Sequence, residues 1–213
     1  MSTYDALPRE FYSRETVGVA KALLGKVLVR SLPRGVLMEG RIVEVEAYSG
    51  ENDPASHAYR GPTKRNSVMF QQVGLAYVYF IYGNHFCLNA TARSESEKAG
   101  AVLLRALEPI TGIEKMTRNR LFSKDKSTNR VERESMPLTQ LANGPGKLAK
   151  AMLVTGKLNG MDLTNPTSIL YIREDHEYIP ELEVVATKRI GISAGEERHW
   201  RFYVRGSVFV SRR

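Results

Sequence analysis

The chain has 213 residues, of which 42% are hydrophobic, enough to bury the core of one domain of ordinary to large size. It contains no run of 18 apolar residues and no basic-then-apolar start, so a membrane-spanning or secreted protein is not expected. The net charge of +8 favours a polyanionic partner, nucleic acid before acidic membrane, although a merely soluble basic protein fits the charge equally well. Cys87 is the one cysteine, which excludes an internal disulfide.

The predicted elements are short strands with a few helices between them. The first helix is expected at 13–26, with apolar residues at helical spacing and Gly25 at its end. Strands are expected at 27–30, 36–48, 76–82, 86–91, 101–107, 169–173, about 183–189 and 201–204. Two more helices are expected at 110–120 and 143–153. No repeat, low-complexity tract or linker divides the chain, which indicates one mixed α/β domain, residues 1–213, with a short N-terminal extension at 1–10.

Two polar segments interrupt these elements. The segment between Tyr48 and Val68 is rich in Gly, Pro, Ser and Asn, and a loop of this length is usually functional or disordered. Residues 123–135 are charged and are expected to form a mobile loop. The Gly-Pro-Gly run at 144–146 leaves backbone N–H groups at a helix start, which attracts phosphate, although an ordinary helix start is an equally good interpretation.

The alternating stretch RIVEVEAYSG, residues 41–50, places two carboxylates on one face of a strand. Its apolar face is expected to carry Val43, Val45 and Ala47, and its polar face Glu44, Glu46 and Tyr48. The most hydrophobic strand contains Arg105, whose burial is costly unless a carboxylate pairs with it, and Glu46 or Glu44 is the obvious partner. Two interpretations stay open: a structural ion pair, or a general base oriented by the arginine in a polar cleft.

Metal and nucleotide-cofactor sites have no support in the sequence. The four histidines and Cys87 show no paired short spacing such as CxxC or HExxH. No Gly-rich Walker or Rossmann signature occurs either. We therefore expect neither a metal nor a cofactor.

Five segments, in this order, resemble the alkyladenine (3-methyladenine) DNA glycosylases. They are RIVEVEAYSGENDPASHAYRGPTKRNSVMF (41–70), YVYFIYGNHFCLNATA (77–92), AVLLRALEP (101–109), NGPGKLAKAM (143–152) and RFYVRGS (201–207). The resemblance runs from about Phe11 to Ser211. It implies an α+β domain with a curved, largely antiparallel sheet, packed helices and a DNA-inserting β-hairpin. It also implies an enzyme that flips a damaged purine out of duplex DNA and hydrolyses its N-glycosidic bond.

The resemblance assigns roles to the polar strand face and its neighbours. Glu46 matches the base that activates a water molecule, with Arg105 and the backbone of His57 helping to hold that water. The aromatic clamp around the extruded base matches Tyr48, His57 and Tyr79. No lysine occurs between Arg41 and Arg60 and none matches a family nucleophile, so simple hydrolysis without a Schiff base is expected.

Two further assignments fall on the expected hairpin. Asn89 matches the asparagine that crowds the amino group of guanine, and Tyr82 matches the tyrosine that fills the gap left by the flipped nucleotide. A two-residue turn would place Tyr79 and Asn89 on opposite faces. A three-residue loop at 83–85 would pair Tyr79 with Asn89 and keep both on one face, so we predict an odd-length loop or a bulge.

Six basic residues near these segments are candidates for contacts to DNA phosphates, and a solvated surface role is an equal alternative for each. They are Arg60, Lys64, Arg65, Lys147, Lys150 and Arg205. The expected partner is double-stranded DNA with 3-methyladenine, 7-methylguanine, hypoxanthine or ethenoadenine, bound by a monomer without metal or membrane. The expected place is the nucleoid in a bacterial cytoplasm, or the nucleus in a eukaryote. Two rival functions stay open: a non-catalytic minor-groove binder of distorted DNA, and an enzyme of RNA or free nucleosides.

Overall fold

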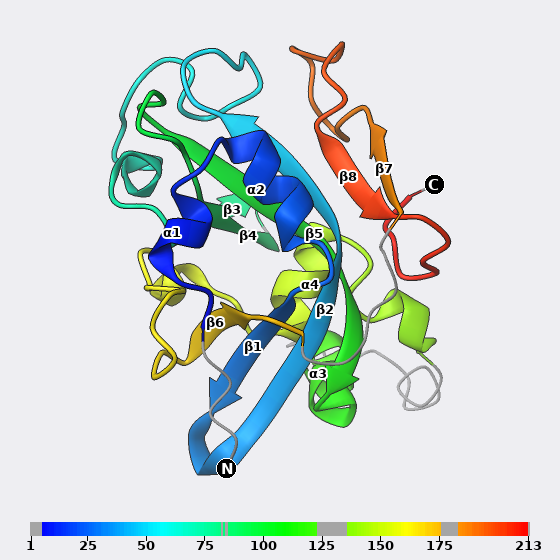
Figure 1. Ribbon diagram of the computed structural model, residues 1–213. Coiled ribbons are helices and arrows are strands. Elements are labelled where there is room, and N and C mark those ends of the chain that lie inside the picture. Colours follow the sequence, from blue (N-terminus) through cyan, green and yellow to red (C-terminus); the bar gives the residue numbers. More distant parts are fainter. Residues whose placement is uncertain (1–5, 82, 84, 123–135, 176–182, 213) are drawn as a thin grey trace.

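An antiparallel sheet organises the chain, seen in a computed structural model that describes residues 6–81, 83, 85–122, 136–175 and 183–212 (Figure 1). Its eight strands in this described part are β1 Val27–Leu32, β2 Val36–Ser49, β3 Ala76–Ile81, β4 His85–Thr91, β5 Gly100–Thr111, β6 Leu170–Arg173, β7 Val184–Thr187 and β8 Arg201–Val204. The main order is β3-β4-β5-β2-β1-β6, and β8 joins β2 to β7. The predicted fold, α+β with a curved antiparallel sheet, is confirmed.

The long strand β2 connects the parts of the sheet. β5 pairs along one edge of β2, while β1 and β8 pair with successive parts of the other edge, Val36–Arg41 and Glu44–Glu46. In Figure 1, the hairpin of β7 and β8 therefore stands beside the end of β2 that is remote from β1. This arrangement brings the segment after β7 close to the carboxylates of β2.

Helices cover the sheet where it is apolar. They are α1 Arg9–Tyr12, α2 Thr16–Leu23, α3 Ile113–Leu121 and α4 Pro145–Ala151, with 3-10 turns η1 Pro33–Gly35, η2 Ser67–Phe70, η4 Leu138–Gln140 and η5 Gly156–Leu158. α2 packs on β2 and β5, α4 packs on β4, and α3 packs on α4. The buried residues of α2 recur at helical spacing, as Thr16, Val19, Ala20 and Leu23. The three apolar ones, Val19, Ala20 and Leu23, share one core cluster with strand residues such as Val45, Leu88 and Leu104.

Several boundaries differ from the predicted ones. α2 is shorter than the helix predicted at 13–26, and α4 is shorter than the one predicted at 143–153. β5 continues to Thr111 because its pairing with β2 extends to Glu39, so α3 starts at Ile113 rather than at 110. Gly112, with φ +74°, makes the turn between them in a conformation that a side chain would strain.

Irregular pairing between β2 and β5 corrects the predicted alternation. Ile42 pairs with Leu107 and Glu44 with Ala106, so Val43 has no residue opposite it on β5. Val45 then pairs with Leu104, so Arg105 has no residue opposite it on β2. Val45 and Ala47 lie in the main core as predicted. Because of the bulge, the next residue of β2 in that core is Ile42 and not Val43. Bulges of this kind turn a side chain toward a site and increase the local twist.

The β3–β4 register keeps the two predicted cavity residues on one face, although not as direct partners. Tyr79 pairs with Cys87 and Tyr77 with Asn89, so the predicted pair of Tyr79 with Asn89 is wrong. The last pair is Ile81 with His85, which leaves three residues between the strands. The predicted odd-length loop is therefore confirmed, one residue earlier than expected, and its parity keeps Tyr79 and Asn89 on the same face.

Some predictions fall on residues outside the described ones. Tyr82, the loop at 123–135 and residues 1–5 of the extension at 1–10 lie there. Among the helices of the described residues, none is long and apolar enough to cross a membrane.

Candidate active site

A cavity of about 300 Å³ opens on the face of the sheet that is opposite the main core. Its lining residues are Tyr48, Ala55, His57, Met69, Tyr77, Tyr79, Ile81, Cys87, Asn89, Ala101, Leu103, Arg105, Pro145, Ile190, Gly191 and Ile192. Strands β2 to β5 supply most of this lining, and the rest comes from two loops, η2 and the start of α4. Pockets for small molecules start at about this volume and are mostly apolar with a few placed polar groups.

Aromatic rings form much of the cavity wall. Tyr48, His57 and Tyr79, the predicted clamp, all line it. The ring of His57 meets that of Tyr79 edge-on, with centroids 4.6 Å apart, and Nδ1 of His57 lies 2.9 Å from the hydroxyl of Tyr77. Burial raises the pKa of Tyr48 and Tyr79 above the ordinary tyrosine value, and raises that of Tyr77 to about 12. The hydroxyls are therefore neutral near pH 7 and able to donate hydrogen bonds.

Asn89 is held in the cavity wall. It is 3% exposed, and its Nδ2 donates to the carbonyl of Tyr77, 2.9 Å away. Because this bond uses the amide nitrogen, the side chain has a fixed orientation. An asparagine fixed in this way resists displacement by a ligand group that enters the cavity.

His57 is expected to be neutral in the folded protein. Partial burial of its ring and the nearby Arg65 guanidinium lower its pKa below the ordinary 6.5. Because the pKa of His57 is lower in the folded than in the unfolded protein, folding favours the neutral ring. The resulting stability is fully present at a pH above the unfolded-state pKa, and it is lost as the pH falls through the folded-state pKa. We predict that His57 titrates below 6.5 in an NMR titration of its ring protons, and that Arg65→Gln raises this midpoint. Titration of wild-type His57 at or above 6.5 would contradict the prediction.

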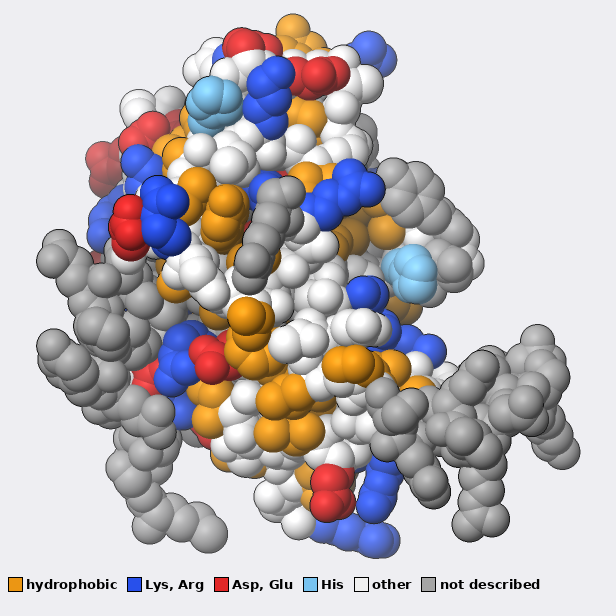
Figure 2. Space-filling view, turned by 90° about the vertical axis from the view of Figure 1, so that its right-hand side faces the viewer, with side chains coloured by type: hydrophobic (Ala, Val, Ile, Leu, Met, Phe, Trp, Pro, Cys, Tyr) orange, Lys and Arg blue, Asp and Glu red, His pale blue; other side chains and the backbone are white. Residues whose placement is uncertain are grey.

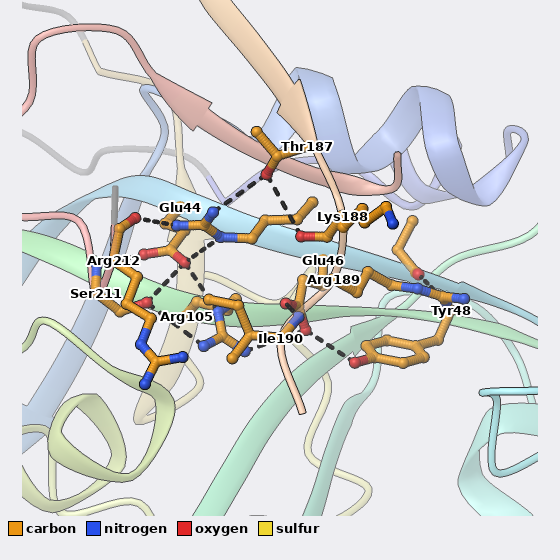
Figure 3. Close-up of polar contacts among 12 residues, drawn as sticks. Glu44, Glu46, Tyr48, Arg105, Thr187, Lys188, Arg189, Ile190, Ser211 and Arg212 are labelled. Carbon is orange, nitrogen blue, oxygen red and sulfur yellow. Dashed lines mark hydrogen bonds and ion pairs between the residues drawn. The ribbon is translucent and has the colours of Figure 1, made fainter. Parts of the chain in front are cut away.

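Glu46 is 0% exposed, accepts hydrogen bonds from two donors and forms an ion pair with a third group (Figure 3). The hydroxyl of Tyr48 donates to Oε2 at 2.8 Å, and the backbone N–H of Ile190 donates to Oε1 at 2.7 Å. Nη1 of Arg105 lies 3.1 Å from Oε2. All three groups belong to residues that line the cavity, whereas Glu46 itself does not line it. The carboxylate therefore lies directly behind the cavity wall, and a water molecule that touches it must fit between these three neighbours.

Arg105 joins both predicted carboxylates. Its Nε donates to Glu44 at 2.9 Å, and Glu44 also accepts from Nε of Arg201 at 2.8 Å and from the N–H of Ser211 at 2.6 Å (Figure 3). Burial alone would lower the pKa of Arg105, but attraction to Glu46 and Glu44 holds it above its ordinary value. Burial would likewise raise the pKa of Glu44, but its hydrogen bonds and the two arginines hold it lowered. Glu44 thus has the surroundings of a structural partner, while Glu46 adjoins the cavity.

The candidate phosphate contacts lie in different surroundings. Arg60, Lys64 and Lys150 are exposed. Arg65 is exposed too, but its guanidinium lies over the ring of Tyr79, 5.3 Å from the centroid. Lys147 donates to Asn143 at 2.7 Å.

Arg205 differs from the other candidates because it already has an acidic partner. Its Nε lies 2.6 Å from Glu183, and both side chains are largely exposed. An exposed pair of this kind is weak, so it leaves the cation able to meet a phosphate.

Three residues of the site were not predicted from the sequence. Ile190 reaches Glu46 through its backbone, and Asp53 and Arg189 form a buried ion pair beside the cavity. A backbone donor leaves no residue-type signal, and the ion pair joins residues 136 positions apart. In the part of the chain that the structure describes, no group of three or more His, Cys, Asp or Glu side chains has a metal-binding arrangement.

An aromatic cavity with a buried carboxylate behind its wall has the form of a site for a flat ring, with a candidate general base beside it. The family model for methylpurine-DNA glycosylase matches residues 10–208. A protein of Koribacter versatilis is 46% identical to this chain over 206 residues, and the match covers 96% of this chain and 92% of that protein. A protein of Carboxydothermus hydrogenoformans is 46% identical over 207 residues, and the match covers 97% of this chain and 99% of that protein. A protein of Clostridium acetobutylicum is 45% identical over 209 residues, covering 96% and 97%. All three have the provisional name 3-methyladenine DNA glycosylase.

The chain belongs to the methylpurine-DNA glycosylase family, whose model covers nearly its whole length. It is accordingly an enzyme of DNA repair that hydrolyses N-glycosidic bonds, and it acts on alkylation damage in DNA.

Proposed function

We propose that this glycosylase flips 3-methyladenine, 7-methylguanine, hypoxanthine and ethenoadenine out of duplex DNA, hydrolyses their N-glycosidic bonds and leaves an abasic site. The observation that supports this most is the aromatic cavity with Glu46 directly behind its wall. The relatives are bacterial, which supports action on the nucleoid DNA of a bacterial cytoplasm. We propose a monomer that uses neither metal nor cofactor.

The extruded purine is proposed to stack in the cavity against Tyr48, His57 and Tyr79. Stacking of a base on an aromatic ring contributes about 1 to 3 kcal/mol and tolerates different purines. Rings that line one cavity of about 300 Å³ suit a flat ligand of that kind. A cavity that selects for flatness rather than for one hydrogen-bond pattern accounts for several accepted lesions.

Glu46 is the proposed base. A water molecule between the cavity and the carboxylate would lose a proton to Glu46 as it attacks the anomeric carbon of the flipped nucleotide, through an oxocarbenium-like transition state. Arg105 contacts the same carboxylate and lines the cavity, so it orients both Glu46 and the water. The backbone of His57 is the third proposed contact; its carbonyl already accepts a bond from Asn66 at 2.7 Å, which fixes its direction.

Asn89 is the proposed guard against normal guanine. Its side chain is fixed by the bond to Tyr77 and buried, so the exocyclic amino group of guanine would collide with it rather than displace it. Tyr82, outside the described residues, is proposed to fill the gap in the duplex, because it follows the last paired residue of β3, Ile81.

The reaction is proposed to be hydrolysis without a covalent enzyme intermediate. No lysine lines the cavity in the described part of the chain, and none occurs between Arg41 and Arg60. A Schiff base needs such an amine. We predict that borohydride traps no protein–DNA adduct while the base is being released. A trapped adduct on a denaturing gel would contradict the prediction.

Basic side chains near the cavity are proposed to contact the DNA backbone. Figure 2 shows one face of the molecule, on which Lys and Arg side chains are scattered among apolar and uncharged ones. Partial burial and the nearby Arg120 lower the pKa of both Lys147 and Lys150, so each lysine lies close enough to Arg120 to be repelled by its charge. A phosphate there would relieve their mutual repulsion. Lys147 also stands in α4, whose first residue, Pro145, lines the cavity.

We predict that Lys150→Ala lowers the slope of log affinity against log salt by about 0.9, the value for one lost phosphate contact on duplex DNA. Lys21→Ala is the matched control, because Lys21 is an exposed lysine on α2, which packs on the core face of the sheet. Fluorescence-anisotropy titrations of a short duplex at several salt concentrations give the slopes. Equal slopes for Lys150→Ala and wild type would refute the contact.

The proposed function is tested with a panel of duplexes, each carrying one of the four lesions, in buffer with EDTA. Mass spectrometry should detect the free base, and mild alkali should cut the strand at the abasic site. Tight binding of these duplexes without any release would favour the rival non-catalytic binder of distorted DNA. Release from free nucleosides or RNA at rates equal to those for duplex DNA would favour the other rival.

A further inference from the structure

We propose that the buried ion pair of Asp53 with Arg189 is a positioning unit, which sets the geometry of two cavity walls around Glu46. This inference rests on the proposed function and adds two positioning residues to it. Neither side chain lines the cavity, and neither was assigned a role by the sequence.

The ion pair is bidentate and has no exposed surface. Nη1 of Arg189 lies 2.5 Å from Oδ2 of Asp53, and Nη2 lies 2.7 Å from Oδ1, with both side chains 0% exposed. Two parallel hydrogen bonds of this kind fix the orientation of both groups as well as their distance. A geometry so fixed suits a positioning role, because either partner can move only with the other.

Arg189 is also tied to β2 and to the rings beside the cavity. Nη1 donates to the carbonyl of Ala47 at 2.9 Å, and Figure 3 shows the guanidinium next to Tyr48. It lies 4.8 Å from the ring centroid of Tyr48 and 5.2 Å from that of Trp200. The ring of Tyr48 thus has the Arg189 cation on it, while its hydroxyl donates to Glu46. Arg189 therefore fixes the ring of Tyr48, which is proposed to stack on the flipped base.

One wall of the cavity follows Arg189 directly along the chain. The next residue, Ile190, donates its backbone N–H to Oε1 of Glu46, and residues 190–192 line the cavity. Only one peptide unit separates the Cα atom of Arg189 from that of Ile190, about 3.8 Å away. A shift of the arginine is therefore passed to the hydrogen bond on Glu46.

Another part of the cavity wall follows Asp53 along the chain. Oδ1 of Asp53 accepts the N–H of Ala55 at 3.2 Å, and its carbonyl accepts the N–H of Ser56 at 2.8 Å. These bonds shape the loop that brings Ala55 and His57 to the cavity. One ion pair thus joins the loop after β2 to the segment after β7, and both segments line the cavity.

Gly195 supports the same assignment. A Cβ atom there would lie 3.1 Å from Nη2 of Arg189, so the guanidinium would have to move by a few tenths of an ångström, and 3.4 Å from Oδ1 of Asp53, an ordinary contact. Its φ of +64° also disfavours a side chain. Gly195→Ala consequently disturbs the pair while both charged groups remain.

The test compares Arg189→Lys, Asp53→Asn and the milder Gly195→Ala with wild type. Matched controls are Arg173→Lys and Glu39→Gln, which change another buried ion pair, 2.9 Å long, that involves the far part of β2. Three quantities are measured: the single-turnover rate of hypoxanthine release at saturating protein, the half-saturating protein concentration, and the fluorescence of Trp200, the only tryptophan. Thermal unfolding selects the temperature at which every variant is folded.

We expect Arg189→Lys and Asp53→Asn to release the base about 10- to 100-fold more slowly at saturation, because misplacement by about 1 Å has effects of this size. Gly195→Ala moves the pair by less and should slow release to a smaller extent. The half-saturating concentration should change little, and Trp200 emission should shift in Arg189→Lys. The controls should keep the wild-type rate and emission. Normal rates in all three variants, or slow rates shared by the controls, would overturn the inference while the proposed function stands. Absence of release by wild type would instead refute the proposed function, and the positioning role with it.

Discussion

Replacement of Glu46 by glutamine should slow base release about 100- to 10,000-fold, the usual contribution of a general base, with duplex affinity nearly unchanged. Glutamine has the same shape as glutamate, so the buried site can keep its packing, but its amide cannot accept a proton from water. Single-turnover release from a hypoxanthine duplex at saturating protein, together with anisotropy titrations, separates the rate from the affinity.

Glu108→Gln is a matched control for this result. Glu108 is a carboxylate of β5 that pairs with Arg41 at 2.6 Å, is 35% exposed and does not line the cavity. Its loss should leave the rate within about twofold of wild type. If Glu46→Gln also kept its rate within tenfold of wild type, another group would have to be the base, and the assignment of Glu46 would be wrong.

Arg105→Ala should lower the free energy of unfolding by about 3 to 5 kcal/mol, the loss found when one partner of a buried ion pair is removed. The reason is that Glu44 and Glu46 are both 0% exposed and would face each other without the cation between them. Glu44 would keep Arg201 as a cation, but Glu46 would keep only the neutral donors of Tyr48 and Ile190. Urea unfolding followed by circular dichroism measures the change.

The comparison variant for this stability prediction is Arg118→Ala. Arg118 forms an ion pair with Glu114 at 3.7 Å on the surface of α3, with side chains 77% and 92% exposed. A pair of this kind contributes at most about 0.5 kcal/mol. A loss below about 1 kcal/mol for Arg105→Ala would show that the two carboxylates do not depend on the arginine as the structure indicates.

The sequence predicted those parts of the site that depend on local pattern. Alternation placed Glu44, Glu46 and Tyr48 on one strand face, and the cost of a buried guanidinium pointed to their contact with Arg105, which the structure confirms. Likewise, an odd number of residues in the hairpin loop was enough to put Tyr79 and Asn89 on one face. The predicted register was wrong, because Tyr79 pairs with Cys87 rather than with Asn89.

The remaining parts depend on contacts that no local pattern records. The bulges that skip Val43 and Arg105 arise from the pairing of two distant strands, so alternation alone misplaced Val43. The bond from Ile190 to Glu46 uses a backbone group, which every residue but proline has. The pair of Asp53 with Arg189 requires that the segments after β2 and β7 meet, and this follows only from the pairing of β8 with β2.

The central claim is that this protein hydrolyses the bond between a damaged purine and its sugar in duplex DNA. The most direct measurement is single-turnover incubation of wild-type protein with a duplex containing one hypoxanthine, beside an identical duplex with adenine at that position. The predicted result is free hypoxanthine in an amount equal to the abasic sites formed, with no release of adenine. A duplex that is bound by the protein but still carries its hypoxanthine would contradict the account.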